Sequence, residues 1–81
     1  KMNVLGLFAK VEEALGEEAG AVGHDTTSEN IGGWDSLGHI TILGMLDDET
    51  GGASADIVDL TQANSMAEII QILSENNLLE K

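Results

Sequence analysis

The stretch Gly32–Ile40 reads GGWDSLGHI, and it joins a pair of glycines to the start of an apolar helical pattern. Asp35 and Ser36 are both favourable N-cap residues, because their side-chain oxygens accept a hydrogen bond from a free backbone N–H group. We therefore expect a helix that begins at Asp35 or Ser36 and ends at Gly51 and Gly52. Apolar residues cover much of its circumference: Leu37, Ile42, Leu43, Met45 and Leu46.

Upstream of this stretch, apolar residues at helical spacing predict a first helix over residues 3 to 15, with Asn3 as its N-cap. Its stripe consists of Val4, Leu5, Phe8, Val11 and Leu15. Residues 16–34 contain five glycines and a cluster of Asp, Thr, Ser and Asn, which argues against a continuous helix. We expect a long loop here, anchored by Val22, Ile31 and Trp34.

Downstream of the stretch, Ser54 is the expected cap of a short third helix that carries Ile57, Val58 and Leu60. Ser65–Glu68 has the pattern of a capping box, and it opens a helix with the stripe Met66, Ile69, Ile70 and Leu73. No segment shows the sustained alternation of a strand. The prediction is a single all-α domain over residues 1–81, a four-helix bundle with a short third helix and a long loop between the first two helices.

The chain is strongly acidic, with 3 Lys and Arg residues against 15 Asp and Glu residues and a formal net charge of −12. We expect no nucleic-acid binding, because phosphate contacts require Lys and Arg, and an anionic membrane surface would also repel the protein. The charge either serves solubility or steers the protein towards basic partners. No segment approaches the ~18 apolar residues of a membrane span. We expect a cytoplasmic monomer.

Ser36 follows a glycine-rich turn at a helix start, so we expect it to be exposed. Its hydroxyl lies at the positive end of the helix dipole, where a phosphate group is stabilised. Ser36 can therefore be a helix cap, an enzyme nucleophile or the attachment point of a phosphate-linked group. A nucleophile would need His39 or His24 as a base, together with an oxyanion hole and a pocket, which so small a bundle is not expected to offer. We therefore expect that the chain is not an enzyme.

The residues Asp35-Ser36-Leu37, between a long loop and an apolar helix in a chain of this length, resemble the attachment motif of acyl carrier proteins. The longer form Gly33–His39 is similar to carriers of polyketide and related secondary-metabolite pathways. The tripeptide alone is a weak signal, whereas its place in an acidic helical chain is specific. The acid before the serine favours an acyl carrier over a peptidyl carrier.

The resemblance implies that a phosphopantetheinyl transferase attaches 4′-phosphopantetheine from coenzyme A covalently to Ser36, with Asp35 and Leu37 as neighbours in the cofactor site. The thiol of this arm would hold an acyl group as a thioester, and the chain has no cysteine of its own. Acyltransferases or ligases and ketosynthase-type enzymes are the further implied partners. Their implied contact face lies on the second helix: Leu37, Ile40, Thr41, Gly44, Asp47 and Asp48.

We expect no metal site, because the segment from Asp47 to Val58 lacks the glutamate that a calcium loop needs at its twelfth position. Weak cation binding at Asp47, Asp48, Glu49 and Asp56 stays open as an alternative.

The first two turns of the second helix carry no charge, unlike those of fatty-acid carriers, so recognition near Ser36 is expected to be more apolar. A fatty-acid synthesis carrier nevertheless stays open, as does a helical interaction module that is never modified. Trp34 is expected to pack at the entry to the helix in a staple-like contact, with a contact to a partner protein as the alternative.

Overall fold

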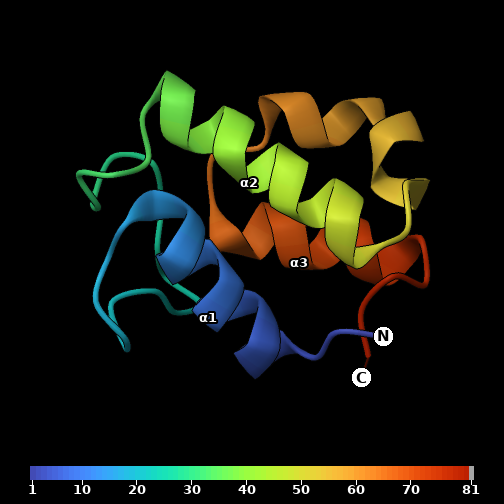
Figure 1. The fold of residues 1–81 in the computed structure, drawn as a ribbon, viewed down its shortest axis with the longest axis horizontal. Coiled ribbons are helices and arrows are strands. Elements are labelled where there is room, and N and C mark those ends of the chain that lie inside the picture. Colours follow the sequence, from blue (N-terminus) through green and yellow to red (C-terminus); the bar gives the residue numbers. More distant parts are fainter. Residues whose placement is uncertain (81) are drawn as a thin grey trace.

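The computed structural model describes residues 1–80, which form three α-helices and two 3₁₀-helices and contain no β-strand (Figure 1). The elements in chain order are α1 (Val4–Leu15), α2 (Ser36–Glu49), η1 (Ala53–Asp56), η2 (Val58–Gln62) and α3 (Met66–Glu75). Figure 1 shows η1 and η2 running alongside α2, with α1 on the other side of α2 in this view. The first and last described residues lie close together, and the N–H of Glu80 donates to the carbonyl of Met2 (2.8 Å).

The predicted four-helix bundle is wrong, because the expected third helix is not an α-helix. Its residues form η1 and η2, which are separated by Ile57 in an extended conformation with φ −99° and ψ 97°. The segment is rich in Ser, Thr, Asp and β-branched residues, all of which disfavour an α-helix. Ser54 is not an N-cap but lies buried within η1, and its N–H donates to Thr50 Oγ1 (3.0 Å).

Side-chain caps begin each of the three α-helices. Asn3 Oδ1 accepts from the Gly6 N–H (2.7 Å), and Ser65 Oγ accepts from the Glu68 N–H (3.1 Å), as predicted. The second half of the capping box differs, since the Glu68 carboxylate accepts from the N–H of Asn64 rather than from that of Ser65. Each such cap stabilises a helix by about 1 kcal/mol.

The core is formed where α1, α2 and α3 meet η2. Leu7 and Val11 of α1 face Ile42 and Leu46 of α2 in one cluster of buried side chains, and Leu60 is the residue that η2 contributes to it. The cluster is completed from α3 by Met66, Ile69 and Leu73. Burying a side chain of this size stabilises the fold by about 1.5–3 kcal/mol, so this small cluster supplies much of the driving force.

The long loop from residue 16 to 35 is hydrogen-bonded to α1 near its start and to α3 near its middle. Near its start, the buried carboxylate of Glu12 accepts hydrogen bonds from the N–H groups of Gly20 and Val22 (both 2.9 Å). Further along, the carbonyl of Thr26 accepts from the N–H of Met66 at the start of α3 (2.9 Å). The predicted anchors Val22 and Trp34 are confirmed as buried, and Ile31 is partly buried.

None of the helices within the described residues 1–80 is long and apolar enough to cross a membrane.

Candidate functional site

Ser36 is the first residue of α2 and is exposed to solvent. The predicted N-cap was Asp35 or Ser36, and the structure selects Asp35, whose Oδ1 accepts from the Gly38 N–H (2.8 Å). The hydroxyl of Ser36 is therefore not used as the cap of its own helix. It stands at the end of α2 to which the helix dipole gives a partial positive charge.

A groove of about 480 Å³ opens beside Ser36, between the start of α2, the end of η2 and the loop. Its walls carry both apolar and polar side chains: Ser28, Trp34, Asp35, Ser36, His39, Ile40, Leu43, Thr61, Ala63 and Asn64. A second hollow of about 380 Å³ continues between α2 and the two 3₁₀-helices and shares Ile40, Leu43 and Thr61 with the first. The two hollows together form a trough along α2 that starts at Ser36.

Two glycines let the backbone turn tightly into α2. A Cβ atom on Gly38 would collide with the carbonyl oxygen of Gly33 and would lie 2.9 Å from Leu15 Cδ2. A Cβ atom on Gly33 would lie 2.6 Å from the carbonyl oxygen of Leu15. The loop, the first turn of α2 and the end of α1 therefore approach closely at Gly33 and Gly38, where no side chain intervenes. This contact sets the position of Asp35 and Ser36.

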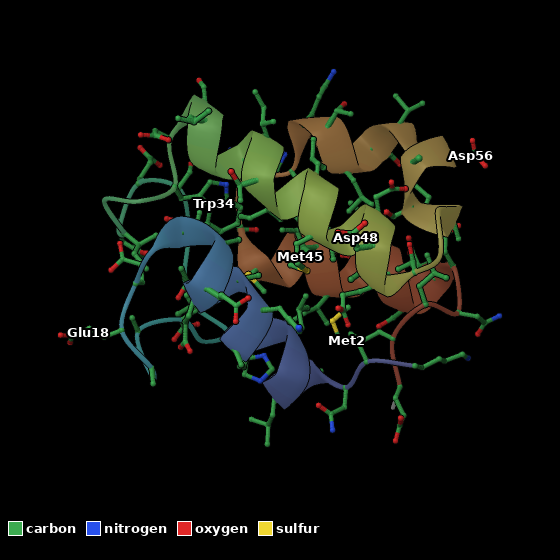
Figure 2. The ribbon with its side chains drawn as sticks, in the orientation of Figure 1. Met2, Glu18, Trp34, Met45, Asp48 and Asp56 are labelled. Carbon is green, nitrogen blue, oxygen red and sulfur yellow. The ribbon has the colours of Figure 1, made fainter. Side chains whose placement is uncertain are left out.

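Trp34 and His39 form a pair beneath this turn, and Figure 2 shows Trp34 lying inside the molecule beside the first turns of α2. Trp34 is only 3% exposed, and its indole Nε1–H donates to Nδ1 of His39 (3.1 Å). The two rings are stacked, with centroids 6.1 Å apart and an interplanar angle of 12°. The other ring nitrogen of His39, Nε2, lies 2.9 Å from the carbonyl oxygen of Leu60 in η2.

The staple-like packing predicted for Trp34 is confirmed, but the hydrogen bonds of its partner were not predicted. With Asp35 as the N-cap, Trp34 occupies the position before the cap and His39 the fourth helical position, which are the two positions of a hydrophobic staple. The spacing alone could therefore have named His39 as the partner. Its bond to Leu60 crosses to a distant segment, for which no sequence signal exists.

Neither His39 nor His24 is hydrogen-bonded to Ser36 within residues 1–80. Both ring nitrogens of His39 are engaged, one by Trp34 and the other by Leu60, so neither is directed at the serine hydroxyl. The His24 ring packs edge-on against Phe8 of α1, with centroids 5.1 Å apart. The serine–histidine pair required by a nucleophilic mechanism is thus not assembled among residues 1–80. The expectation that the chain is not an enzyme stays a prediction.

The predicted partner face is an exposed ridge of α2. Leu37 and Ile40 are 71% and 64% exposed, and Val58 of η2, which was not predicted to belong to the face, is 74% exposed. Thr41, Gly44 and Asp48 are also exposed, while Asp47 is half-buried. A groove of about 590 Å³ between α1 and α2 runs along the acidic end of this ridge and includes Thr41, Gly44, Asp47 and Asp48.

The acidic residues considered for weak cation binding do not come together. Figure 2 shows Asp48 on α2 well separated from Asp56 at the end of η1. The carboxylate of Glu49 is paired with the ammonium group of Lys10 at 3.5 Å. Among residues 1–80, no group of three or more His, Asp or Glu side chains is arranged to hold a metal ion.

No protein-family model, no curated protein and no solved structure matches this chain significantly. The functional interpretation therefore rests on the motif around Ser36 and on the geometry described above.

Proposed function

We propose that the chain is an acyl carrier protein, which holds acyl groups as thioesters on a 4′-phosphopantetheine arm attached to Ser36, in polyketide or related biosynthesis. The observation that carries the proposal is the position of Ser36. It is exposed, it is the first residue of α2, and it is not used as the helix cap. A phosphodiester there would place its negative charge at the positive end of α2.

The surroundings of Ser36 also suit the arm and its cargo. In the attachment step, the oxygen of Ser36 would lose its proton and bond to the phosphorus atom of coenzyme A that bears the pantetheine. The bond from this phosphorus to the bridging oxygen of the pyrophosphate would break, and adenosine 3′,5′-bisphosphate would leave. The trough along α2 begins at this hydroxyl and becomes more apolar towards Ile57 and Leu60. An acyl chain of moderate length could lie along it, shielded from water, because burial of apolar surface is favourable.

The surface around the trough supports recognition by enzymes. Leu37 and Ile40 of α2 and Val58 of η2 are large exposed apolar side chains, and such side chains are suited to burial in an interface. The acids Asp47 and Asp48 lie further along α2 and would steer basic partners towards it. A phosphopantetheinyl transferase is the first partner required, followed by acyltransferases or ligases and ketosynthase-type enzymes.

The uncharged first turns of α2 favour secondary metabolism over fatty-acid synthesis, where this part of the helix is acidic. The cytoplasm is the proposed compartment, since coenzyme A and the modifying enzyme act there.

The test is the mass of the intact unmodified protein before and after incubation with a broad-specificity phosphopantetheinyl transferase, coenzyme A and Mg²⁺. We expect the gain of one phosphopantetheine group, located on the peptide that contains Ser36. The Ser36→Ala variant should gain nothing. The Ser28→Ala variant, which alters the other serine of the same groove, should gain the full mass.

A second candidate function is a helical interaction module that is never modified, favoured by the exposed apolar side chains of Leu37, Ile40 and Val58. The same experiment separates the two. If folded, unmodified protein gains no mass with any of several transferases, the carrier proposal is wrong and the interaction module becomes the better interpretation.

A further inference from the structure

The side chain of His39 connects two parts of the fold that are distant in sequence. It belongs to the second turn of α2, and its ring reaches the carbonyl oxygen of Leu60 in η2 at 2.9 Å. At the other edge of the ring, Nδ1 receives the indole N–H of Trp34 at 3.1 Å. The loop before α2, α2 itself and η2 are thus joined through one imidazole ring.

The two partners of His39 determine which nitrogen carries the proton. An indole N–H is only a donor, so Nδ1 must be the acceptor and cannot carry a hydrogen. A backbone carbonyl oxygen is only an acceptor, so Nε2 must carry the hydrogen and donate it to Leu60. The neutral ring with its proton on Nε2 satisfies both neighbours at once, whereas the tautomer with its proton on Nδ1 satisfies neither.

The rest of η2 has few means of attachment to α2. It is a 3₁₀-helix of five residues, and within it Leu60 is the one buried residue. The backbone before it is extended at Ile57, so η2 is not continued by a regular helix on that side. Short 3₁₀-helices have weaker hydrogen bonds than α-helices, and η2 therefore depends on its side-chain contacts with the body of the protein.

The bond from His39 reaches η2 at its buried residue, beside the groove that opens at Ser36. Thr61, the next residue of η2, lines that groove opposite Ile40 of α2. The contact that holds η2 against α2 therefore also sets the distance between Thr61 and Ile40, the two walls of the groove.

We infer that His39 is a positioning residue, which holds η2 against α2 through Leu60 and thereby sets the width of the groove at Ser36, with Trp34 fixing the ring in its Nε2–H form. The inference goes beyond the proposed function and does not rest on it, because it concerns the unmodified protein.

The first test needs no variant. Nitrogen-15 NMR of the unmodified protein at neutral pH reports which nitrogen of each histidine carries hydrogen, and we expect the Nε2–H form for His39. Among residues 1–80 the ring of His24 is seen packed edge-on against Phe8 rather than between two hydrogen-bond partners, and it serves as the internal comparison. A His39 ring with its hydrogen on Nδ1, or a mixture of the two forms, would overturn the inference.

The second test uses two substitutions that each preserve one side of the ring. In His39→Asn, the amide oxygen occupies the position of Nδ1 and can accept from Trp34, but nothing reaches Leu60. In His39→Gln, the amide nitrogen occupies the position of Nε2 and can donate to Leu60. Amide hydrogen exchange of Leu60 and Ala63 measures the opening of η2, and that of Val11 in α1 measures unfolding of the whole protein.

We expect Leu60 and Ala63 to exchange about fivefold faster in His39→Asn, relative to Val11, because a hydrogen bond that stabilises η2 alone is lost. His39→Gln should restore most of the protection. If Leu60 and Val11 accelerate equally in His39→Asn, or if the two variants behave alike, His39 contributes only general stability and the inference is wrong. The results of the NMR test and of the exchange test do not depend on whether Ser36 accepts phosphopantetheine.

Discussion

The carbonyl oxygen of Gly33 lies so close to Gly38 that no Cβ atom fits between them. Gly38 is one of two glycines inside α2, and a glycine within a helix is ordinarily less favourable than alanine. The two glycines differ in their packing, because a Cβ atom on the other one, Gly44, would meet no neighbouring atom within 4 Å. Gly38 is required by the turn that carries Ser36, whereas Gly44 is not required by packing.

Gly38→Ala should therefore destabilise the protein by about 1–3 kcal/mol, since the new methyl group forces the loop away from α2. Gly44→Ala is the matched control and should stabilise it by about 0.5–1 kcal/mol, because alanine is the better helix former. Urea unfolding of both variants measures the difference. Equal effects of the two substitutions would mean that the close approach of Gly33 is not tight in solution.

The cap of α2 leads to a second prediction, which distinguishes Asp35 from its neighbour. Asp35→Ala removes the hydrogen bond to the Gly38 N–H and should cost about 1 kcal/mol of stability. Ser36→Ala removes no cap, so its free energy of unfolding should stay within about 0.5 kcal/mol of the parent. Thermal or urea unfolding tests this, and a Ser36→Ala variant that loses as much stability as Asp35→Ala would contradict the assignment of the cap.

The starts of the α-helices were predictable because each depends on a local hydrogen bond that the side chain of Asn3, Asp35 or Ser65 accepts. The conformation of residues 53–62, after α2, was not predictable, because it depends on contacts remote in sequence. Leu60 is buried in the core, and its carbonyl oxygen lies 2.9 Å from Nε2 of His39 in α2. These contacts replace the α-helix that Ser54 and the apolar residues after it suggested.

The exposure of Ser36 and its place at the helix start were likewise predictable from the glycine-rich turn before it. The path of the long loop was not, because a glutamate in a helical sequence is ordinarily expected to face solvent. Glu12 instead points inwards and binds two backbone N–H groups of the loop. The charge of this residue is satisfied by groups that no local pattern brings together.

A third prediction concerns this buried carboxylate. Glu12→Ala leaves the N–H groups of Gly20 and Val22 without their acceptor, and the loss of hydrogen bonds to a charged group should cost about 2–3 kcal/mol. Glu13→Ala, which removes an exposed carboxylate from the next position, should change stability by less than about 0.5 kcal/mol. Urea unfolding compares the pair, and a small effect of Glu12→Ala would show that the loop is not held by this residue.

A fourth prediction concerns the acidic end of α2 and rests on the proposed function. Replacing Asp47 and Asp48 together by Lys should slow association with a basic phosphopantetheinyl transferase, because electrostatic steering acts mainly on the association rate. The variant should also flatten the salt dependence of that rate, since fewer favourable charges remain to be screened. Surface plasmon resonance at several ionic strengths measures both effects.

The matched control replaces Asp56 and Asp59 by Lys, which changes the net charge equally but at exposed positions of η1 and η2. If α2 presents the docking face, the control should slow association clearly less than the variant at Asp47 and Asp48. Equal slowing by both pairs would mean that the transferase responds to the total charge of the protein rather than to this end of α2. Unchanged kinetics in both would mean that these acids serve solubility alone.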